Sequence, residues 1–169
     1  AVALGWIVSR ESFFDNLSNT VNFLKLKGSI GRLGNDRTSN FQYLKTFALT
    51  NDPVMVIGGN PTAALYTNAP PNVKITWETS TLTNVGFESM FWNGKLAVDF
   101  EWFYKVTKDI LQGQGGLFPP TIGGYYPSTI NSGIVDNRGF DLQIRHRNTL
   151  GGLRYGVTGN FNWAKNKII

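Results

Sequence analysis

The chain has 169 residues, of which 41% are hydrophobic, 14% aromatic and 16% charged. Charge is low for an ordinary domain, whereas glycine and aromatic residues are abundant and favour strands and turns over helices. The absence of cysteine excludes disulfide scaffolds, thiolate metal sites and cysteine nucleophiles. The net charge of +5 comes from scattered basic residues, and no run of Lys and Arg indicates a nucleic-acid or membrane-surface patch.

Six segments in chain order show the two-residue alternation of apolar and polar side chains that predicts β-strands. They are residues 1–7, 21–33, 73–91, 95–107, 135–145 and 153–165. Several of them run to a dozen residues or more. A usual globular strand has about five or six residues, whereas a transmembrane strand needs about 9–11. No apolar run is long enough for a transmembrane helix.

The dipeptide Asn93-Gly94 predicts a two-residue hairpin turn of type I′, because both central residues of that turn need positive φ. With this turn, Phe87 faces Phe100 and Val85 faces Trp102, so the apolar faces of the two strands coincide. A slip of one residue would place these side chains on opposite faces. Turn and alternation therefore agree on one register.

The same register sets Glu88 opposite Asp99, and like charges directly opposite each other destabilise a sheet. If segment 21–33 lies beside segment 73–91, Lys25 and Lys27 supply the opposite charge. The hypothesis requires at least one of these lysines within about 8 Å of the carboxylates, roughly one Debye length at physiological salt.

The connections between the segments alternate in length. Residues 10–20, 93–94 and 147–152 form short connections, and the first of them is expected to contain one helical turn. Residues 35–72 and 112–132 form long connections rich in Gly, Pro, Asn and Tyr. In an antiparallel up-and-down sheet, short turns then lie at one end and long loops at the other, as in outer-membrane barrels.

Alternation alone leaves two folds open. In a soluble β-sandwich that binds carbohydrate or serves as an adhesin, the apolar faces meet in a core. In an all-β, antiparallel up-and-down transmembrane β-barrel, they meet lipid, and the polar faces line a wet lumen. Strand length, unequal loops and the terminal aromatics Trp6, Trp92 and Trp163 favour the barrel.

The barrel interpretation assigns the side chains of the strands to two surfaces. The predicted lipid-facing residues are Val85, Phe87, Phe100, Trp102, Val157 and Phe161. The predicted lumen-facing residues are Lys25, Lys27, Glu78, Glu88, Asp99, Glu101 and Asn160. Aromatic residues of the long connections are candidates for ligand or partner binding, the alternative being that they pack on one another. These are Phe41, Tyr43, Tyr66, Tyr125 and Tyr126.

No catalytic residue, metal ligand or cofactor site is predicted. His146 lies between two arginines in a predicted turn, and no second His or Cys accompanies it to bind zinc. Asp99 and Glu101 share a face as a glycosidase pair would, but their alternating context favours a lumen lining. Residues 112–116 lack the spacing of a phosphate-binding loop.

Five segments resemble SusC/RagA-type TonB-dependent transporters, in the order of that family. Residues 4–13 (LGWIVSRESF) resemble the family's GW.IS.E.F segment, and residues 24–36 are similar to its LKLR.SYG..GN strand. Residues 75–86, beginning ITWE, resemble a third strand. Shorter matches follow at residues 137–141 (NRGFD) and 159–168 (GNFNWAKNKI).

The resemblance implies that residues 1–169 are the later part of a single barrel domain, about six strands of an implied 22, a size class with a plugged lumen. The signal peptide, the plug and the closing C-terminal strand are expected to be absent from this chain. The implied function is import of an oligosaccharide or peptide, with a SusD-like surface lipoprotein and the TonB complex as partners and outer-membrane lipid around the barrel. A siderophore or cobalamin receptor is the alternative within the same barrel class.

Overall fold

The computed structural model describes residues 1–50, 55–123, 125–127 and 129–169, and antiparallel β-sheet dominates it. Six long strands carry the fold. They are β1 (Val2–Ile7), β2 (Val21–Asn35), β7 (Glu78–Phe91), β8 (Leu96–Gly113), β9 (Thr129–Leu150) and β10 (Leu153–Ile168). No helix among the described residues is both long and apolar enough to cross a membrane.

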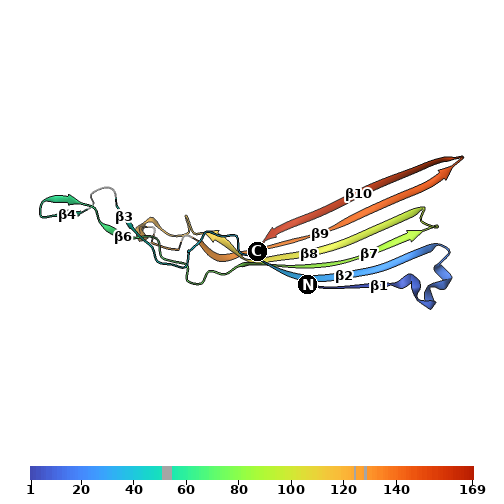
Figure 1. Cartoon of the computed structure of the whole chain (residues 1–169), viewed down its shortest axis with the longest axis horizontal. Helices are drawn as coiled ribbons and strands as arrows, with labels where there is room; N and C mark the ends of the chain where they lie inside the picture. The colour runs from blue at the N-terminus through green and yellow to red at the C-terminus, as the bar shows by residue number, and fades with distance from the viewer. Residues whose placement is uncertain (51–54, 124, 128) are drawn as a thin grey trace. The chain divides into compact units, whose positions relative to one another are not determined.

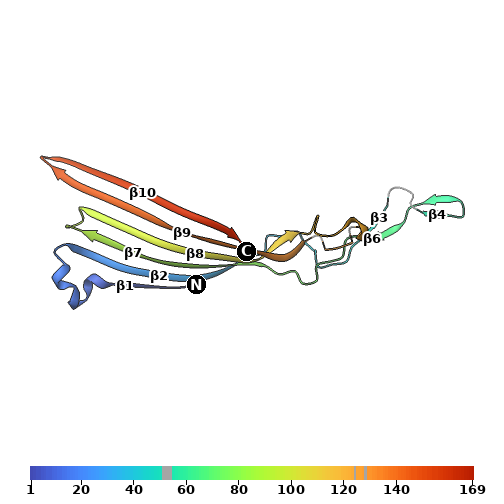
Figure 2. The ribbon, with the colours of Figure 1, turned by 180° about the vertical axis from the view of Figure 1, so that it is seen from behind.

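The long strands form one sheet in the order β1-β2-β7-β8-β9-β10, so every neighbour is the next long strand along the chain. Figure 1 shows them side by side in this order. The three short connections lie at one end of the sheet, as the view from behind also shows (Figure 2). The first of these contains the 3₁₀ helices η1 (Val8–Arg10) and η2 (Ser12–Leu17). This is the predicted up-and-down arrangement with alternating short and long connections.

The described residues divide into two compact units. The first contains residues 1–33, 79–107 and 134–169, and therefore most of the six-stranded sheet. The second contains residues 34–78 and 108–133, which are the long connections and the strand ends that join them. Its small elements are two hairpins and the 3₁₀ helix η3 (Pro120–Ile122). The hairpins pair β3 (Phe47–Leu49) with β6 (Leu65–Thr67) and β4 (Met55–Ile57) with β5 (Asn60–Thr62).

The turn between β7 and β8 confirms the predicted register. Asn93 and Gly94 have φ values of 54° and 80°, as a type I′ turn requires, and Trp92 also has a positive φ of 50°. The Ser89 hydroxyl donates a hydrogen bond of 3.2 Å to the Val98 carbonyl across the pair. The rings of Phe87 and Phe100 stack with centroids 5.7 Å apart.

Several predicted strand boundaries are wrong, and β9, predicted from residue 135, begins at Thr129. The alternation predicts a strand from residue 73, but β7 begins at Glu78. Before it, the Asn72 side chain accepts the Lys74 N–H at 3.1 Å and the Asn72 carbonyl accepts the Ile75 N–H at 3.2 Å, so turn hydrogen bonds replace strand pairing.

A further correction concerns His146, which lies within β9 rather than in a turn. It pairs with Val157, and its ring nitrogen lies 3.3 Å from the Tyr155 hydroxyl. The turn itself consists of Gly151 and Gly152, both at positive φ. This tight Gly-Gly reversal lets β9 continue through a polar stretch that resembles a loop in the sequence.

The first unit has no conventional hydrophobic core. Among the described residues, only Val8 and Phe14 are buried hydrophobic side chains, and both belong to the short connection after β1. The large apolar residues of the strands remain exposed, with Val157 at 63% and Phe161 at 59%. Within the described part of this unit there is one sheet, so no second layer covers these side chains as a β-sandwich would require.

Candidate functional site: the two faces of the sheet

One face of the sheet carries a cluster of charges centred on Lys27. Its ammonium group lies 3.0 Å from Asp99, 3.3 Å from Glu88 and 3.3 Å from Glu101. Lys27 comes from β2, Glu88 from β7, and the other two carboxylates from β8, so one side chain bridges three strands. We call these four residues the Lys27 cluster, and the side of the sheet that carries them the polar face.

Strand alternation explains why the cluster forms. Asp99 and Glu101 are two residues apart in β8 and therefore share a face, and the hairpin turn places Glu88 opposite Asp99. Lys27 reaches both because β2 is the next strand beyond β7. The hypothesis that a lysine of this strand neutralises the acidic pair is confirmed for Lys27. Lys25 forms no ion pair within the described residues.

Hydrogen bonds extend the polar face onto β9 and β10. Arg145 donates to the Gln143 side-chain carbonyl at 2.9 Å, and Gln143 in turn donates to the Asn160 side-chain carbonyl at 2.9 Å. An open hollow of about 470 Å³ lies between these hydrogen-bonded side chains and Lys27. Its lining is mostly polar and comprises Lys27, Asp99, Glu101, Asp141, Leu142, Gln143, Asn160, Phe161 and Asn162. The hollow offers hydrogen-bond donors and acceptors to a polar solute.

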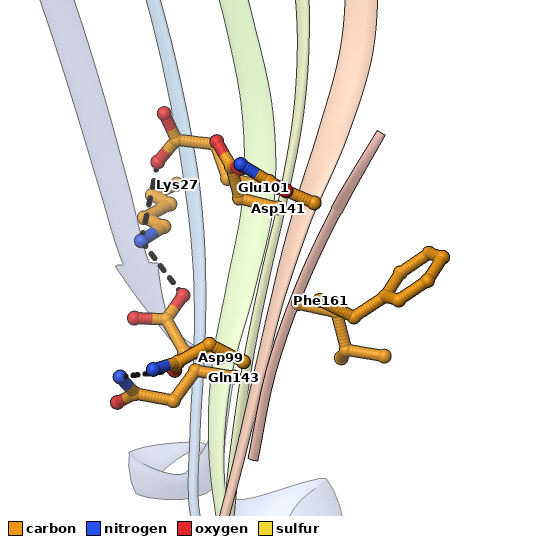
Figure 3. Close-up of a pocket in the computed structure, with 9 residues that line it drawn as sticks. Lys27, Asp99, Glu101, Asp141, Gln143 and Phe161 are labelled. Carbon is orange, nitrogen blue, oxygen red and sulfur yellow. Dashed lines mark hydrogen bonds and ion pairs between the residues drawn. The ribbon is translucent and has the colours of Figure 1, made fainter. Parts of the chain in front are cut away.

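Figure 3 shows that Lys27, Asp99 and Gln143 project to one side of the strands, whereas the Phe161 ring projects to the other. That other side, the apolar face, carries a row of aromatic rings across four strands. Phe100 and Phe140 have centroids 5.9 Å apart, and Phe140 lies 5.7 Å from Phe161 and 6.1 Å from Trp163. Phe87 extends the row onto β7 through its stack with Phe100.

Gly86 makes the approach of Lys27 to the β7–β8 pair possible. A Cβ atom at this position would collide with the Phe100 carbonyl and lie 3.0 Å from the Glu101 Cα and 3.2 Å from the Lys27 side chain. Gly159 in β10 has no atom within 4 Å of the equivalent point. A glycine is therefore needed at the first position and not at the second.

The structure brings most of the predicted polar residues together but places two elsewhere. Asn160 borders the hollow with the Lys27 cluster. Lys25 borders a second hollow, which is lined by residues of β1, β2 and β7 and by Glu101 of β8 and shares Lys27 and Glu101 with the first. Glu78 belongs to the second unit, where it accepts hydrogen bonds from the Asn35 side chain at 3.1 Å and from the Leu111 N–H at 3.3 Å.

The predicted loop aromatics all lie in the second unit and have different surroundings. Phe41, Tyr43, Tyr66 and Tyr125 are exposed. Tyr126 stacks on Phe118 with centroids 4.8 Å apart, which is the internal packing that the alternative interpretation anticipates.

The predicted set omits four residues of the polar face, namely Asp141, Gln143, Arg145 and Asn162. Alternation places Asn162 on the polar side of β10 and the first three on the polar side of β9, so the sequence carries this signal. The sequence does not place that strand against β8, because the connection of residues 112–132 is long and carries no register information. Without the register of β9 against β8, the sequence does not predict which residues line the other side of the hollow beside Lys27.

Comparison with known proteins identifies the family. The family model described as "TonB dependent receptor-like, beta-barrel" matches residues 10–169. The chain belongs to this family. TonB-dependent receptors are outer-membrane β-barrel proteins, so the six-stranded sheet is part of an outer-membrane barrel. The barrel is not closed within this chain.

Relatives support the assignment along the whole chain. TonB-dependent receptor P26 of Formosa agariphila is 27% identical over 177 residues, covering 100% of this chain and 16% of the relative. TonB-dependent receptor SusC of Bacteroides thetaiotaomicron is 24% identical, covering 99% of this chain and 17% of the relative. This chain therefore spans about one sixth of the length of these receptors. The relatives are receptors and transporters rather than enzymes.

Solved structures show the same fold. The RagAB peptide importer in its open-open state matches with a TM-score of 0.77 and 22% identity, covering 98% of this chain and 17% of that chain. The closed-closed state of the same importer matches with a TM-score of 0.75. The arrangement of strands in this chain thus matches that of the corresponding strands in these structures.

Proposed function

We propose that this chain is a wall segment of a TonB-dependent outer-membrane receptor that imports an oligosaccharide or a peptide. The observation that carries the proposal is the two-faced sheet of a family member, with the Lys27 cluster on one side and the aromatic row on the other. In a barrel of this family, the polar face lines the lumen and the apolar face contacts lipid. The names SusC and RagAB among the relatives favour this substrate class over siderophores or cobalamin.

The lumen assignment gives the polar residues a role in passage of the substrate. The hollow beside Lys27 presents carboxylate, amide and ammonium groups, which exchange hydrogen bonds with hydroxyl or peptide groups. All described members of the Lys27 cluster are partly solvent-exposed, so they can bind and release a passing solute without a large desolvation cost. This part of the chain contributes binding groups rather than a reaction centre.

The partners and domain organisation belong to the same proposal. Residues 1–169 form about six of an implied 22 strands in a single barrel domain. A SusD-like surface lipoprotein would cover the end of the barrel that carries the long connections. The TonB complex would act through parts of the full-length protein outside this chain.

A growth experiment tests the import function. A strain lacking the full-length receptor is grown on a panel of oligosaccharides and peptides, with and without an intact TonB complex. We expect loss of growth on one of these substrate classes, restored by the receptor only when the TonB complex is intact. Uptake that continues without the TonB complex would contradict the proposal.

The loop aromatics provide a narrower test of substrate or lipoprotein binding. Tyr125 is exposed at 57%, whereas the Tyr126 ring is already stacked on Phe118. If the loop binds a partner, Tyr125→Ala in the full-length receptor weakens binding of substrate or lipoprotein by about 1–3 kcal/mol. Unchanged binding, measured by calorimetry for both Tyr125→Ala and Tyr126→Ala, would show that these rings serve only internal packing.

A further inference from the structure

A second group of charges lies on the apolar face, beyond the aromatic row. In the β9–β10 register, Trp163 pairs with Phe140, Lys165 with Arg138, and Lys167 with Asp136. This pairing is continuous, and side chains two apart in a strand share a face. Arg138, Lys165 and Lys167 therefore project on the same side as the aromatic row. We call these three cations the outer basic group.

No acidic side chain in the described part of the chain forms an ion pair with this group. All ion pairs among the described residues involve Lys27, on the other face. Asp136 stands opposite Lys167, but it is buried, forms no ion pair, and leaves one carboxylate oxygen without a hydrogen-bond partner. Arg138, Lys165 and Lys167 are all exposed. An excess of positive charge therefore remains on this surface.

The two faces differ in how they handle like charges. Glu88 and Asp99 repel each other on the polar face, and Lys27 compensates them at 3.3 and 3.0 Å. Arg138 and Lys165 are likewise directly opposite each other, which destabilises the strand pair unless an anion intervenes. The one acidic residue that the β9–β10 pairing places beside the group, Asp136, forms no ion pair and could balance only one of the three cations, so compensation of the others has to come from outside the described residues.

The position of the group along the strand indicates where that charge is found. On β10, Tyr155 and Trp163 lie about 26 Å apart at a rise of roughly 3.3 Å per residue. A strand tilted by about 40° then spans about 20 Å of membrane thickness between these two aromatics, close to the apolar band of about 25 Å in outer-membrane barrels. Lys165 and Lys167 lie two and four residues after Trp163 and therefore on the same face, at the level of the lipid headgroups.

We propose that the outer basic group binds the phosphate of anionic lipid headgroups, in the leaflet at the long-connection end of the strands. The guanidinium of Arg138 suits bidentate contact with phosphate oxygens, and the two ammonium groups add point charges. Phe140, Phe161 and Trp163 lie next to these cations along the strands and provide the surface for the acyl chains. The proposal rests on the apolar face contacting lipid and goes beyond the import function.

The test is a titration of the full-length receptor in detergent with phosphatidylglycerol or, separately, phosphatidylcholine, followed by native mass spectrometry. The variant Arg138→Gln/Lys165→Gln/Lys167→Gln removes the group. The control Lys25→Gln/Lys105→Gln/Arg154→Gln removes the same number of cations from polar-face positions. Each cation near an anionic surface contributes about a fivefold increase in affinity. We therefore expect the first variant to bind phosphatidylglycerol about 100-fold more weakly, and the control to bind it as tightly as the unaltered receptor.

A site-specific signal keeps the result interpretable if the full-length receptor has other lipid sites. In vesicles that contain brominated phosphatidylglycerol, we measure the tryptophan fluorescence of the receptor and of its Trp163→Phe variant. The difference between the two signals is the fluorescence of Trp163, and its loss on addition of the brominated lipid is the quenching of that residue. We expect stronger quenching by brominated phosphatidylglycerol than by brominated phosphatidylcholine, lost in the outer-group variant. Equal quenching by both lipids in the unaltered receptor would show that protein carboxylates compensate the group, and it would overturn the proposal. An equal loss of phosphatidylglycerol binding in the outer-group variant and in the control would also overturn it. Import is measured separately, so failure here leaves that function untouched.

Discussion

At the scale of single residues, Lys27 compensates the two carboxylates, Glu88 and Asp99, that the register of the β7–β8 hairpin places opposite each other. Its ammonium group contacts three carboxylates from two strands, and its side chain is 26% exposed. Ion pairs with this much access to water are individually weak. Together they offset the repulsion between Glu88 and Asp99, which the hairpin turn makes unavoidable.

Replacing Lys27 should therefore cost more than replacing its neighbour on the same face. We expect Lys27→Met to lower the free energy of unfolding by about 1–2 kcal/mol, because the three carboxylates lose their shared counter-charge. Lys25→Met, which breaks no ion pair among the described residues, should stay within about 0.5 kcal/mol. Urea unfolding of the full-length receptor from lipid vesicles measures both. Equal effects would refute the role of Lys27, whereas adding Asp99→Asn and Glu101→Gln to Lys27→Met should recover stability.

Two glycines provide a second test at this scale. Gly86→Ala should destabilise by about 1–3 kcal/mol, since the new methyl group meets the Phe100 carbonyl and the backbone of Glu101. Gly159→Ala has open space and should be neutral or stabilising by about 0.5–1 kcal/mol. The same unfolding measurement separates them. If Gly86→Ala were as stable as Gly159→Ala, β7 and β8 would not approach as closely as described.

At the scale of elements, alternation and one turn predict the hairpin that carries most of the site. Asn93-Gly94 sets the β7–β8 register from the sequence alone, and the stack of Phe87 on Phe100 confirms it. The start of β7 is not predictable from alternation, because Asn72 forms a turn that overrides the apolar residues after it. The small β4–β5 hairpin is also missed, although Gly58 and Gly59, both at positive φ, are a turn signal.

The candidate site is predictable only where a short turn sets the register. The hairpin brings Glu88 and Asp99 together, and a neighbouring strand with lysines completes the Lys27 cluster. The opposite wall of the hollow, with Asp141 and Gln143, depends on the pairing of β9 with β8 across a long connection. No local signal in that connection determines the pairing, so those residues emerge only from the structure.

Adjacent residues of β10 test the assignment of the two faces. Val157→Lys should lower the free energy of unfolding in vesicles by about 1–2 kcal/mol, because the ammonium group must enter hydrocarbon between the level of Tyr155 and the bilayer midplane. Thr158→Lys places the same charge on the polar face and should cost far less. Titration with guanidinium chloride compares the two variants. Similar costs at both positions would be incompatible with lipid on one face and water on the other.

At the scale of the whole molecule, the sheet makes sense only as part of something larger. The chain spans about one sixth of the length of its receptor relatives, and its long strands have almost no buried apolar side chains. A free sheet with this much exposed aromatic surface would associate or aggregate in water. On the function proposed above, lipid of the outer membrane would cover this surface, and the polar face would contact the solute that crosses the barrel.

The most direct test of this account is an accessibility scan along β10. Each residue from 156 to 162 of the full-length receptor is replaced in turn by cysteine and spin-labelled. The accessibility of each label in vesicles is measured with oxygen, which concentrates in hydrocarbon, and with a water-soluble nickel complex. The account predicts a strict two-residue alternation, with Val157 and Phe161 accessible to oxygen and Thr158 and Asn160 accessible to nickel. Equal access of the nickel complex to Phe161 and Asn160 would contradict it.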